Sequence, residues 1–240
     1  MGTAIEISNL RKDFGAKTAV NNLNLSVSEG IIFSFLGVNG AGKTTTIRML
    51  TGLTKPTSGD AKVLGHSILT DLEEVKKVGN LSPQETSVAP NLTVRENLEF
   101  IAGIYGCPKE EVKKKADEMI ERFELGEVVN SKAKTLSGGW QRRVSIAMAL
   151  ITDPKVLYLD EPTLGLDVLA RRELWKVIEA LRGKVTVILT THYMEEAEAL
   201  SDYIAVMSKG NLVAQGTLDE LRAKTGKEKL EDIFVSIVEG

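Results

Sequence analysis

The sequence predicts an α/β fold with a mostly parallel sheet, because three almost continuously apolar runs alternate with segments of helical periodicity. The runs cover Ile31–Leu36, Val156–Leu159 and Val185–Leu189. Such runs are typical of strands that are buried on both faces, whereas a strand with one wet face alternates between apolar and polar residues. We therefore expect helices packed over a buried sheet.

The chain before the first run shows the alternating pattern instead. Apolar and polar residues alternate in Ile5–Leu10 and again in Leu23–Val27. This period of two indicates strands with one solvated face. We expect the two strands to pair antiparallel and to form an N-terminal β subdomain.

The middle of the chain predicts helices only. Residues from about 85 to 150 hold two or three helical patterns and no convincing strand. Within them, Thr93–Glu96 has the spacing of a capping box, and Pro108 suits the first turn of the helix that follows. This segment is interpreted as a helical subdomain that is inserted into the α/β core.

The end of the chain predicts a last strand pair and a short helical tail. The strands are expected at Tyr203–Met207 and Leu212–Ala214, with a turn at Lys209–Asn211. The predicted organisation is a single domain over residues 1–240. Its α/β core comprises 1–84 and 152–215, its helical subdomain 85–151 and its C-terminal helical tail 216–240.

The composition narrows the class of protein. A chain of 240 residues that is 42% hydrophobic and 26% charged suits one globular domain, and a net charge of −3 gives no basic field for nucleic acid. The single cysteine, Cys107, cannot close a disulfide within the chain. No apolar run approaches the roughly 20 residues that cross a bilayer, and the N-terminus lacks the layout of a signal peptide. We expect a soluble chain that meets a membrane only through a partner.

A glycine-rich loop follows the first apolar run and leads into a segment compatible with a helix. The loop consists of Gly37, Val38, Asn39, Gly40, Ala41, Gly42, Lys43, Thr44 and Thr45. This is the P-loop pattern in its strand–loop–helix context, and it predicts a P-loop NTPase core. Its backbone N–H groups and the helix N-terminus favour phosphate oxygens, Lys43 is expected to reach the β- and γ-phosphates, and Thr44 to ligate Mg²⁺. The alternative is a glycine-rich turn without a ligand.

Two carboxylates stand at the end of the second apolar run. Asp160 and Glu161 follow Leu159 directly, at the strand edge where open α/β sheets bind their ligands. Asp160 is the candidate to hold Mg²⁺, and Glu161 the candidate to orient and polarise an attacking water. The alternative is a solvated strand end before a turn at Pro162.

A second glycine motif makes the family recognisable. Leu136, Ser137, Gly138 and Gly139 stand ahead of a helical stretch and of the acidic strand. This string resembles the signature motif of the ABC family, and together with the P-loop the match covers nearly the whole chain in the expected order. The serine hydroxyl and the N–H groups at a helix start form a second anion site.

Four further positions resemble functional residues of that family. Phe14 resembles the aromatic residue that stacks on adenine, and Gln84 the glutamine that joins core and insert and ligates the metal. Asp167 resembles the D-loop aspartate, and His192 resembles the switch histidine that donates to the γ-phosphate. Other readings stay open: core packing for Phe14, a polar loop residue for Gln84, a helix cap for Asp167 and a structural role for His192.

The resemblance implies a function and its partners. It implies Mg²⁺-dependent ATP hydrolysis by a dimer in which the signature of one subunit contacts ATP held by the other. The dimer, homomeric or heteromeric, would power a separate transmembrane permease at the cytoplasmic face of the membrane. That permease would dock in the groove between core and insert, around Gln84 and the segment to Glu99. The tail near Leu230–Phe234 resembles that of drug and lipid exporter ATPases, which favours export. An importer ATPase, a non-transport ABC ATPase of repair or translation and a nucleotide-binding module without turnover are the rival functions.

Three residues depart from the family's usual pattern. Trp140 stands where glutamine is common, although Gln141 follows it; Val38 replaces a common proline, and Leu164 a small polar residue. None of these changes removes a phosphate ligand. Trp140 is expected either to pack within its own subunit or to touch the opposing nucleotide.

Overall fold

The computed structural model describes residues 2–239, so Met1 and Gly240, the two ends of the predicted domain, lie outside the described residues. The N-terminal part contains a four-stranded antiparallel sheet with the order β2-β1-β4-β5. Its strands are β1 (Thr3–Phe14), β2 (Lys17–Ser28), β4 (Ser58–Val63) and β5 (His66–Ser67). The predicted antiparallel pair is confirmed. Its strands are longer than their alternating segments because shifts in the β1–β2 register interrupt the period of two.

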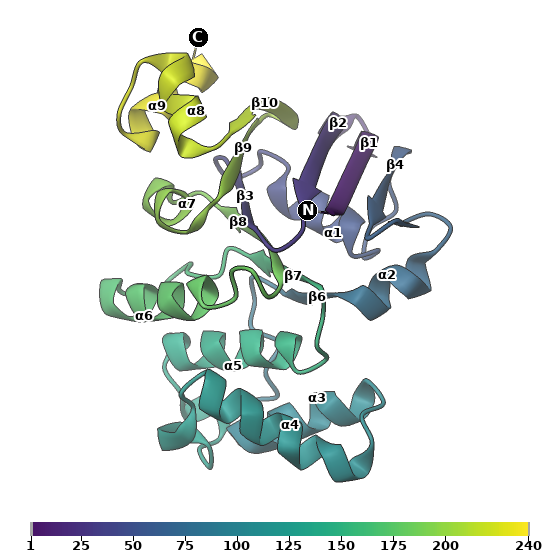
Figure 1. Ribbon diagram of the computed structural model, residues 1–240, viewed down its shortest axis with the longest axis vertical. Coiled ribbons are helices and arrows are strands. Elements are labelled where there is room, and N and C mark those ends of the chain that lie inside the picture. The colour runs from purple at the N-terminus through teal and green to yellow at the C-terminus, as the bar shows by residue number, and fades with distance from the viewer. Residues whose placement is uncertain (1, 240) are drawn as a thin grey trace.

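The second sheet has six strands in the order β10-β9-β3-β8-β7-β6, and Figure 1 shows it running through the middle of the molecule. The strands are β3 (Ile32–Leu36), β6 (Gly79–Ser82), β7 (Val156–Asp160), β8 (Thr186–Thr191), β9 (Tyr203–Ser208) and β10 (Asn211–Gly216). All neighbours are parallel except β10, which pairs antiparallel with β9. Every residue of β3, β7 and β8 is buried, which confirms the three apolar runs as core strands.

Alternate residues of these buried strands contribute to cores on opposite faces of the sheet. Phe33 and Tyr158 pack toward the antiparallel sheet and α1 (Lys43–Leu50), while Leu157 and Leu189 pack toward the helices of the other face. A period of two on a strand that is covered on both sides has this result. The sheet is therefore held rigidly, and its carboxyl edge is a fixed platform for side chains.

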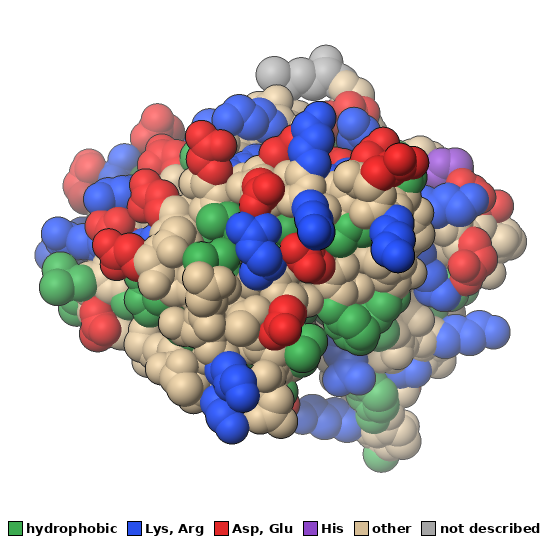
Figure 2. Space-filling model, turned by 90° about the horizontal axis from the view of Figure 1, so that it is seen from below, with side chains coloured by type: hydrophobic (Ala, Val, Ile, Leu, Met, Phe, Trp, Pro, Cys, Tyr) green, Lys and Arg blue, Asp and Glu red, His purple; other side chains and the backbone are tan. Residues whose placement is uncertain are grey.

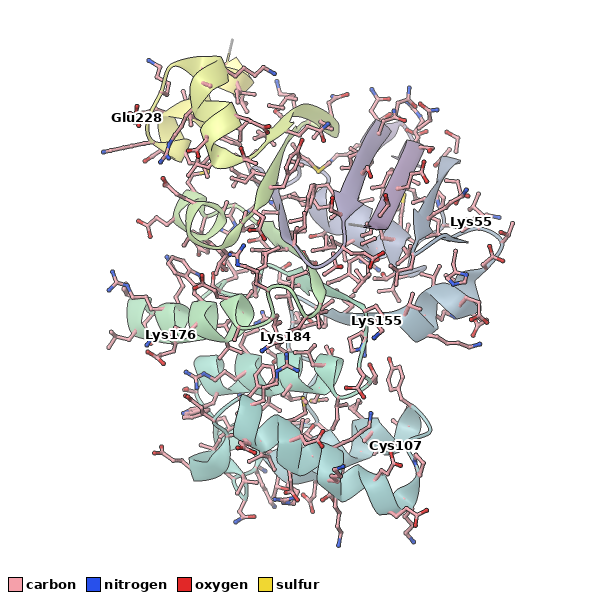
Figure 3. The ribbon with its side chains drawn as sticks, in the orientation of Figure 1. Lys55, Cys107, Lys155, Lys176, Lys184 and Glu228 are labelled. Atoms are coloured by element: carbon pink, nitrogen blue, oxygen red, sulfur yellow. The ribbon has the colours of Figure 1, made fainter. Side chains whose placement is uncertain are left out.

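The helical region occupies the lower part of Figure 1. It contains α3 (Val94–Ile104), α4 (Lys109–Arg122), α5 (Gly138–Leu150) and the short 3-10 helices η1 (Gly126–Val128) and η2 (Ala133–Thr135). Both halves of the capping box between Thr93 and Glu96 are formed, as predicted. Pro108 precedes the first residue of α4 as its N-cap, one position earlier than predicted. Figure 3 shows half-buried Cys107 in this region, between α3 and α4.

Five further helices cover the rest of the molecule. They are α2 (Leu72–Val78), α6 (Val168–Glu179), α7 (Met194–Leu200), α8 (Leu218–Thr225) and α9 (Leu230–Glu239). The last two form the expected C-terminal helical tail and bury Leu221, Leu230 and Ile233 in a small core with α7 and β9. Within residues 2–239 no helix combines the length and the apolar character that a membrane span requires. Figure 2 shows positive and negative side chains intermixed on the face seen from the helical side.

Candidate nucleotide-binding site

The P-loop connects β3 to α1 at the carboxyl edge of the six-stranded sheet. Gly40 and Gly42 have φ values of 83° and 105°, a region that favours glycine. A Cβ on Gly42 would lie 2.5 Å from the carbonyl oxygen of Ala19, and one on Gly37 would lie 2.4 Å from that of Met207. Gly42 also begins α1 without a side-chain cap, so the first-turn N–H groups remain available to an anion.

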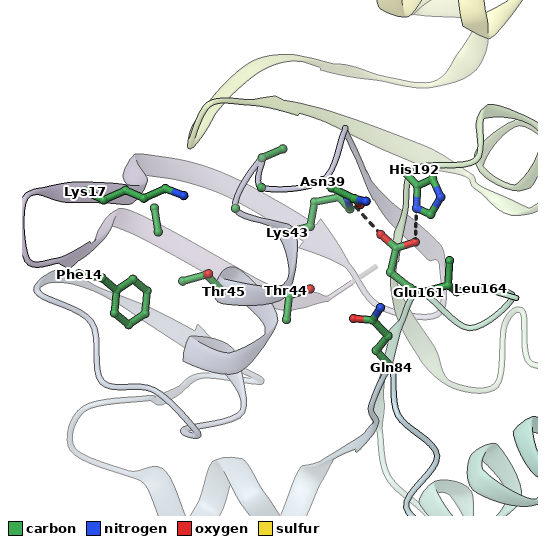
Figure 4. A pocket seen from close by; sticks show the side chains of 14 residues that line it. Phe14, Lys17, Asn39, Lys43, Thr44, Thr45, Gln84, Glu161, Leu164 and His192 are labelled. Atoms are coloured by element: carbon green, nitrogen blue, oxygen red, sulfur yellow. Dashed lines mark hydrogen bonds and ion pairs between the residues drawn. The ribbon is translucent and has the colours of Figure 1, made fainter.

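A cavity of ≈ 450 Å³ opens over this loop, and Figure 4 shows its lining. It is lined by the predicted residues Phe14, Asn39, Gly40, Ala41, Gly42, Lys43, Thr44, Thr45, Gln84, Glu161 and His192, together with Lys17, Ala19 and Leu164. Phe14 lies at one end and is 54% exposed, so it does not pack into the core. The cavity therefore offers an aromatic surface at one end and charged groups at the other.

Lys43 is held by its own loop and by an acid from a distant strand. Its Nζ donates to the carbonyl oxygen of Gly37 at 2.7 Å and lies 3.1 Å from Oε1 of Glu161. The side chains of Lys43 and Glu161 are only 4% and 6% exposed, so little solvent screens this ion pair. A phosphate that approaches Lys43 must compete with the Glu161 carboxylate.

The carboxylate of Asp160 accepts hydrogen bonds from two hydroxyl groups beside the P-loop. Its Oδ1 accepts a hydrogen bond from Oγ1 of Thr44 at 2.9 Å and from Oγ1 of Thr190 at 2.6 Å. Hydroxyl and carboxylate oxygens are ligands that suit Mg²⁺, and the amide of Gln84 points into the same cavity (Figure 4). The donor set therefore fits a magnesium ion that completes its coordination with phosphate oxygens and water.

Glu161 is oriented from two sides. Its Oε2 lies 2.6 Å from Nδ1 of His192, while its backbone N–H donates to the Oγ1 and carbonyl oxygen of Thr190. Glu161 also adopts a φ of 48°, in the left-handed region that non-glycine residues seldom occupy and that is frequent at active sites. The carboxylate is thus fixed between Lys43 and His192, as the dashed lines in Figure 4 show.

The signature residues lie elsewhere on the chain. Ser137, Gly138 and Gly139 begin α5, with Ser137 as N-cap but without a side-chain cap hydrogen bond. None of the three lines the P-loop cavity. Trp140 packs against the core of the helical region, with the Arg143 guanidinium 5.0 Å from its ring centroid, so it packs within its own subunit.

Asp167 also lies away from the cavity lining, and its position has a local structural cause. Its Oδ1 accepts hydrogen bonds from the N–H groups of Leu169 and Ala170, each at 2.9 Å, and so caps α6. The structure therefore shows Asp167 as a helix cap, which is the alternative that the sequence left open. His66, by contrast, is half-buried in the short strand β5, away from the cavity.

Sequence reasoning missed Thr190, Lys17 and Ala19 as parts of the site. Thr190 stands opposite Asp160 in the parallel β7–β8 pairing, a register that no local pattern predicts. Lys17 and Ala19 follow Phe14 and bring the antiparallel sheet over the loop. The one signal that could have pointed to this part of the cavity is the position of Lys17, three residues after Phe14.

A comparison with protein families matches residues 20–164 to the ABC transporter family. The chain belongs to the ABC transporter family. The predictions of an ABC fold and of an ATP-binding ATPase are thereby confirmed. The P-loop cavity described above is the candidate ATP site of this ABC ATPase.

Relatives of known name and structure extend this result. The daunorubicin resistance ATP-binding protein DrrA3 of Streptomyces coeruleorubidus is 40% identical over 97% of this chain and 74% of the relative. A solved ATP-binding subunit of an ABC transporter superposes with a TM-score of 0.86 at 28% identity, over 98% of this chain and 99% of its own. The dimeric structure of the bacterial cassette MJ0796 gives a TM-score of 0.79 at 28% identity, over 89% and 98%. The predicted resemblance to exporter-type ATPases is confirmed.

Proposed function

We propose that two copies of this ABC ATPase, or one copy and a homologous subunit, enclose ATP head to tail and power export through a separate membrane protein. The observation that carries the proposal is the placement of Glu161 between Lys43 and His192 beside the P-loop. That geometry supplies a phosphate-binding cation, a base and a group that orients the base. A binding module without turnover has no need of the last two.

In the proposed binding mode the aromatic end of the cavity takes the base and the P-loop takes the phosphates. Phe14 stacks on adenine, and the γ-phosphate draws Lys43 away from Glu161. Thr44, Asp160 and Gln84 would hold Mg²⁺, which neutralises charge on the β- and γ-phosphates when it is bound.

The reaction is an in-line displacement by water. The water oxygen forms a bond to the γ-phosphorus while the bond from that phosphorus to the bridging oxygen breaks, which gives phosphate and ADP. Glu161, once freed from Lys43, polarises the water and accepts its proton. Nδ1 of His192 donates to the Glu161 carboxylate and keeps it aimed through their 2.6 Å contact.

The signature motif supports the dimeric arrangement. Ser137 and Gly138 are exposed at the start of α5, outside the cavity, and so are free to complete the ATP site of a second subunit. Large apolar side chains are also exposed around the P-loop and the start of α6, a feature typical of contact surfaces. They are Val38 at 51%, Leu164 at 37%, Val168 at 62% and Leu169 at 76%.

The proposed membrane partner docks where the core meets the helical region. A cavity of ≈ 330 Å³ lies there, between Leu53, Leu81 and Tyr105. Leu53 and Tyr105 are 61% and 56% exposed, and α3 adds Phe100 at 54%. These apolar groups suit a short helix of a membrane-spanning subunit, which would place the chain at the cytoplasmic face. The similarity to DrrA3, named as a drug-resistance protein, supports export.

The Glu161→Gln variant tests this function. It removes the base but keeps the shape of the side chain, so hydrolysis should fall by roughly 10²- to 10⁴-fold while ATP binding persists. An ATP-bound dimer should then accumulate, and size-exclusion chromatography detects it. Glu195→Gln, on an exposed side chain, is the matched control. Unchanged turnover in Glu161→Gln would refute the assignment of the base.

A further inference from the structure

Glu196 is a buried acid to which no sequence motif assigned a role. It lies on α7 and is 0% exposed. Its Oε1 accepts a hydrogen bond from Nε1 of Trp175 on α6 at 3.1 Å. Over residues 2–239, no lysine, arginine or histidine forms an ion pair with it. A glutamate is almost never fully buried without a charged partner, so this position requires an explanation.

The surroundings of Glu196 are polar but incompletely paired. Burial raises the pKa of Glu196, while the hydroxyls of Thr191 and Thr163 and the indole of Trp175 act in the opposite direction. The second carboxyl oxygen, Oε2, has no well-formed hydrogen bond within the described part of the chain, and neither has the buried Oγ1 of Thr163. An apolar core would avoid these orphaned groups, so the cluster calls for a role beyond packing.

The three neighbours of Glu196 come from three segments that carry proposed site residues. Thr163 follows Glu161 by two positions, and Thr191 immediately precedes His192. Trp175 belongs to α6, the helix that Asp167 caps. We call these segments the base loop (Glu161–Thr163), the switch-histidine loop (Thr191–Tyr193) and the D-loop helix (α6). The Glu196 carboxyl group therefore lies where the three segments meet.

A second polar contact joins the same helices nearer the surface. The guanidinium of Arg171, on α6, lies 4.5 Å from the ring centroid of Tyr193, the residue after His192. Arg171 also lies 3.9 Å from Glu195, but the Glu195 side chain is 82% exposed, so this surface pair contributes little to the junction. The junction between α6 and the start of α7 is thus built from directional contacts, which fix relative orientation more strictly than apolar packing does.

We propose that Glu196 is a positioning residue for ATP hydrolysis, which sets the base loop and the switch-histidine loop against the D-loop helix. It touches neither nucleotide nor the attacking water, and it acts through Glu161 and His192. The inference rests on the proposed roles of those two residues. It predicts that Glu196 affects the chemical step more than ATP binding, because the P-loop lies outside its contacts.

The test compares Glu196→Leu with Glu196→Gln in the full chain, with Glu195→Leu as the matched control. Glutamine keeps the acceptor for Trp175 and adds a donor for the hydroxyls, whereas leucine keeps only the volume. In Glu196→Leu, kcat should fall roughly ten- to a hundred-fold, the usual effect of a catalytic group that is misplaced by about 1 Å. The KM for ATP should stay within about two-fold of the parent value, and Glu196→Gln should restore most of kcat.

Two results would overturn the inference. One is a Glu196→Leu variant that folds and keeps a kcat within about two-fold of the parent. The other is a Glu196→Gln variant as impaired as Glu196→Leu, because a group that acts through hydrogen bonds is rescued by an isosteric amide. Glu161→Gln measured alongside separates the two proposals: if it keeps full turnover, the proposed base is wrong and this inference falls with it.

A second variant covers the case in which Glu196→Leu fails to fold. Thr163→Val removes one buried hydroxyl next to Glu196 and preserves the shape of the side chain. Because that hydroxyl is the polar group that the base loop presents to Glu196, kcat should fall at least about three-fold with KM unchanged. An unaltered kcat in a folded Thr163→Val variant would contradict the inference on its own.

Discussion

The P-loop and the signature motif each place glycines and a hydroxyl side chain at the start of a helix, yet the two regions differ in how far their side chains are buried and paired. At the P-loop, Lys43, Asp160 and Glu161 are buried, and each has partners from other strands. At the signature, Ser137 and Gly138 are exposed, and the Ser137 side chain caps nothing. The comparison teaches that the P-loop side chains find their partners within one chain, whereas the signature hydroxyl and N–H groups remain available to a ligand or a second subunit.

The largest effect expected from this contrast is at Ser137. Ser137→Arg should fill the signature surface, block the dimer and lower turnover by roughly 10²-fold, the scale for loss of a preorganised donor. ATP binding by a single chain should not change, since Ser137 is outside the cavity. Titration with a fluorescent ATP analogue and a steady-state ATPase assay measure the two quantities.

A control makes this prediction specific. Ser236→Arg adds the same side chain at an exposed position of α9 and should affect neither quantity. If Ser137→Arg weakened ATP binding as much as turnover, the signature would belong to the same half-site as the P-loop, and the contrast would be wrong.

A smaller effect is expected at the aromatic end of the P-loop cavity. Phe14→Ala should weaken ATP binding about two- to ten-fold, which corresponds to the 0.5–1.5 kcal/mol typical of aromatic stacking. Thermal stability should hardly change, because Phe14 is 54% exposed. Isothermal titration calorimetry measures the affinity.

Phe100 provides a matched control for this substitution. It has the same 54% exposure as Phe14 but lies on α3, outside the ATP cavity. Phe100→Ala should leave ATP affinity unaltered. Equal affinities for Phe14→Ala and the parent chain would exclude stacking at this position.

The smallest expected effect concerns pH and the buried acid behind the site. The pKa of Glu196 is raised above 4.5 in the folded chain by burial and by the charge of Glu161, so the folded state binds a proton more tightly than the unfolded state does. Its contribution to stability is therefore complete below pH 4.5 and is lost as pH rises through the raised pKa. Burial lowers the pKa of nearby Arg142, and the charges of Asp160 and Glu196 act in the opposite direction.

Glu196→Gln should remove this dependence. Its Tm relative to the parent chain should increase with pH above 4.5, by a few degrees in total, since about 1 kcal/mol changes Tm by roughly 2–4 °C in a chain of this size. Circular dichroism melts at a series of pH values measure the difference in Tm between the two proteins. The other carboxyl groups are common to both, so their effects cancel in this difference. A difference that is constant with pH would mean that Glu196 does not titrate in this way.

Local patterns predicted the parts of the fold that are buried or motif-bearing. The runs at β3, β7 and β8 could be found because strands covered on both faces must be apolar throughout. The short strands β4 and β6 were missed, because Ser58–Val63 and Gly79–Ser82 contain few apolar residues and are half-exposed. Their strand conformation comes from pairing with β1 and β7 rather than from their own residues.

The candidate site divides in the same manner. The P-loop and the acidic strand end could be recognised because their residues are contiguous in the chain. The contacts of Asp160 with Thr190 and of Lys43 with Glu161 could not, since they depend on strand register between distant segments. Glu196 gave no signal, because an acid beside Glu195 in a short helix resembles an exposed helix face.

Under the proposed mechanism, the ion pair between Lys43 and Glu161 also determines the order of events at the site. As long as the ammonium holds this carboxylate, the proton acceptor is occupied and water in the cavity meets no active base. Arrival of the triphosphate exchanges one anion for another on the lysine and releases the acid in the same step. In that mechanism, Glu161 becomes available as a base only after the γ-phosphate has taken its place on Lys43.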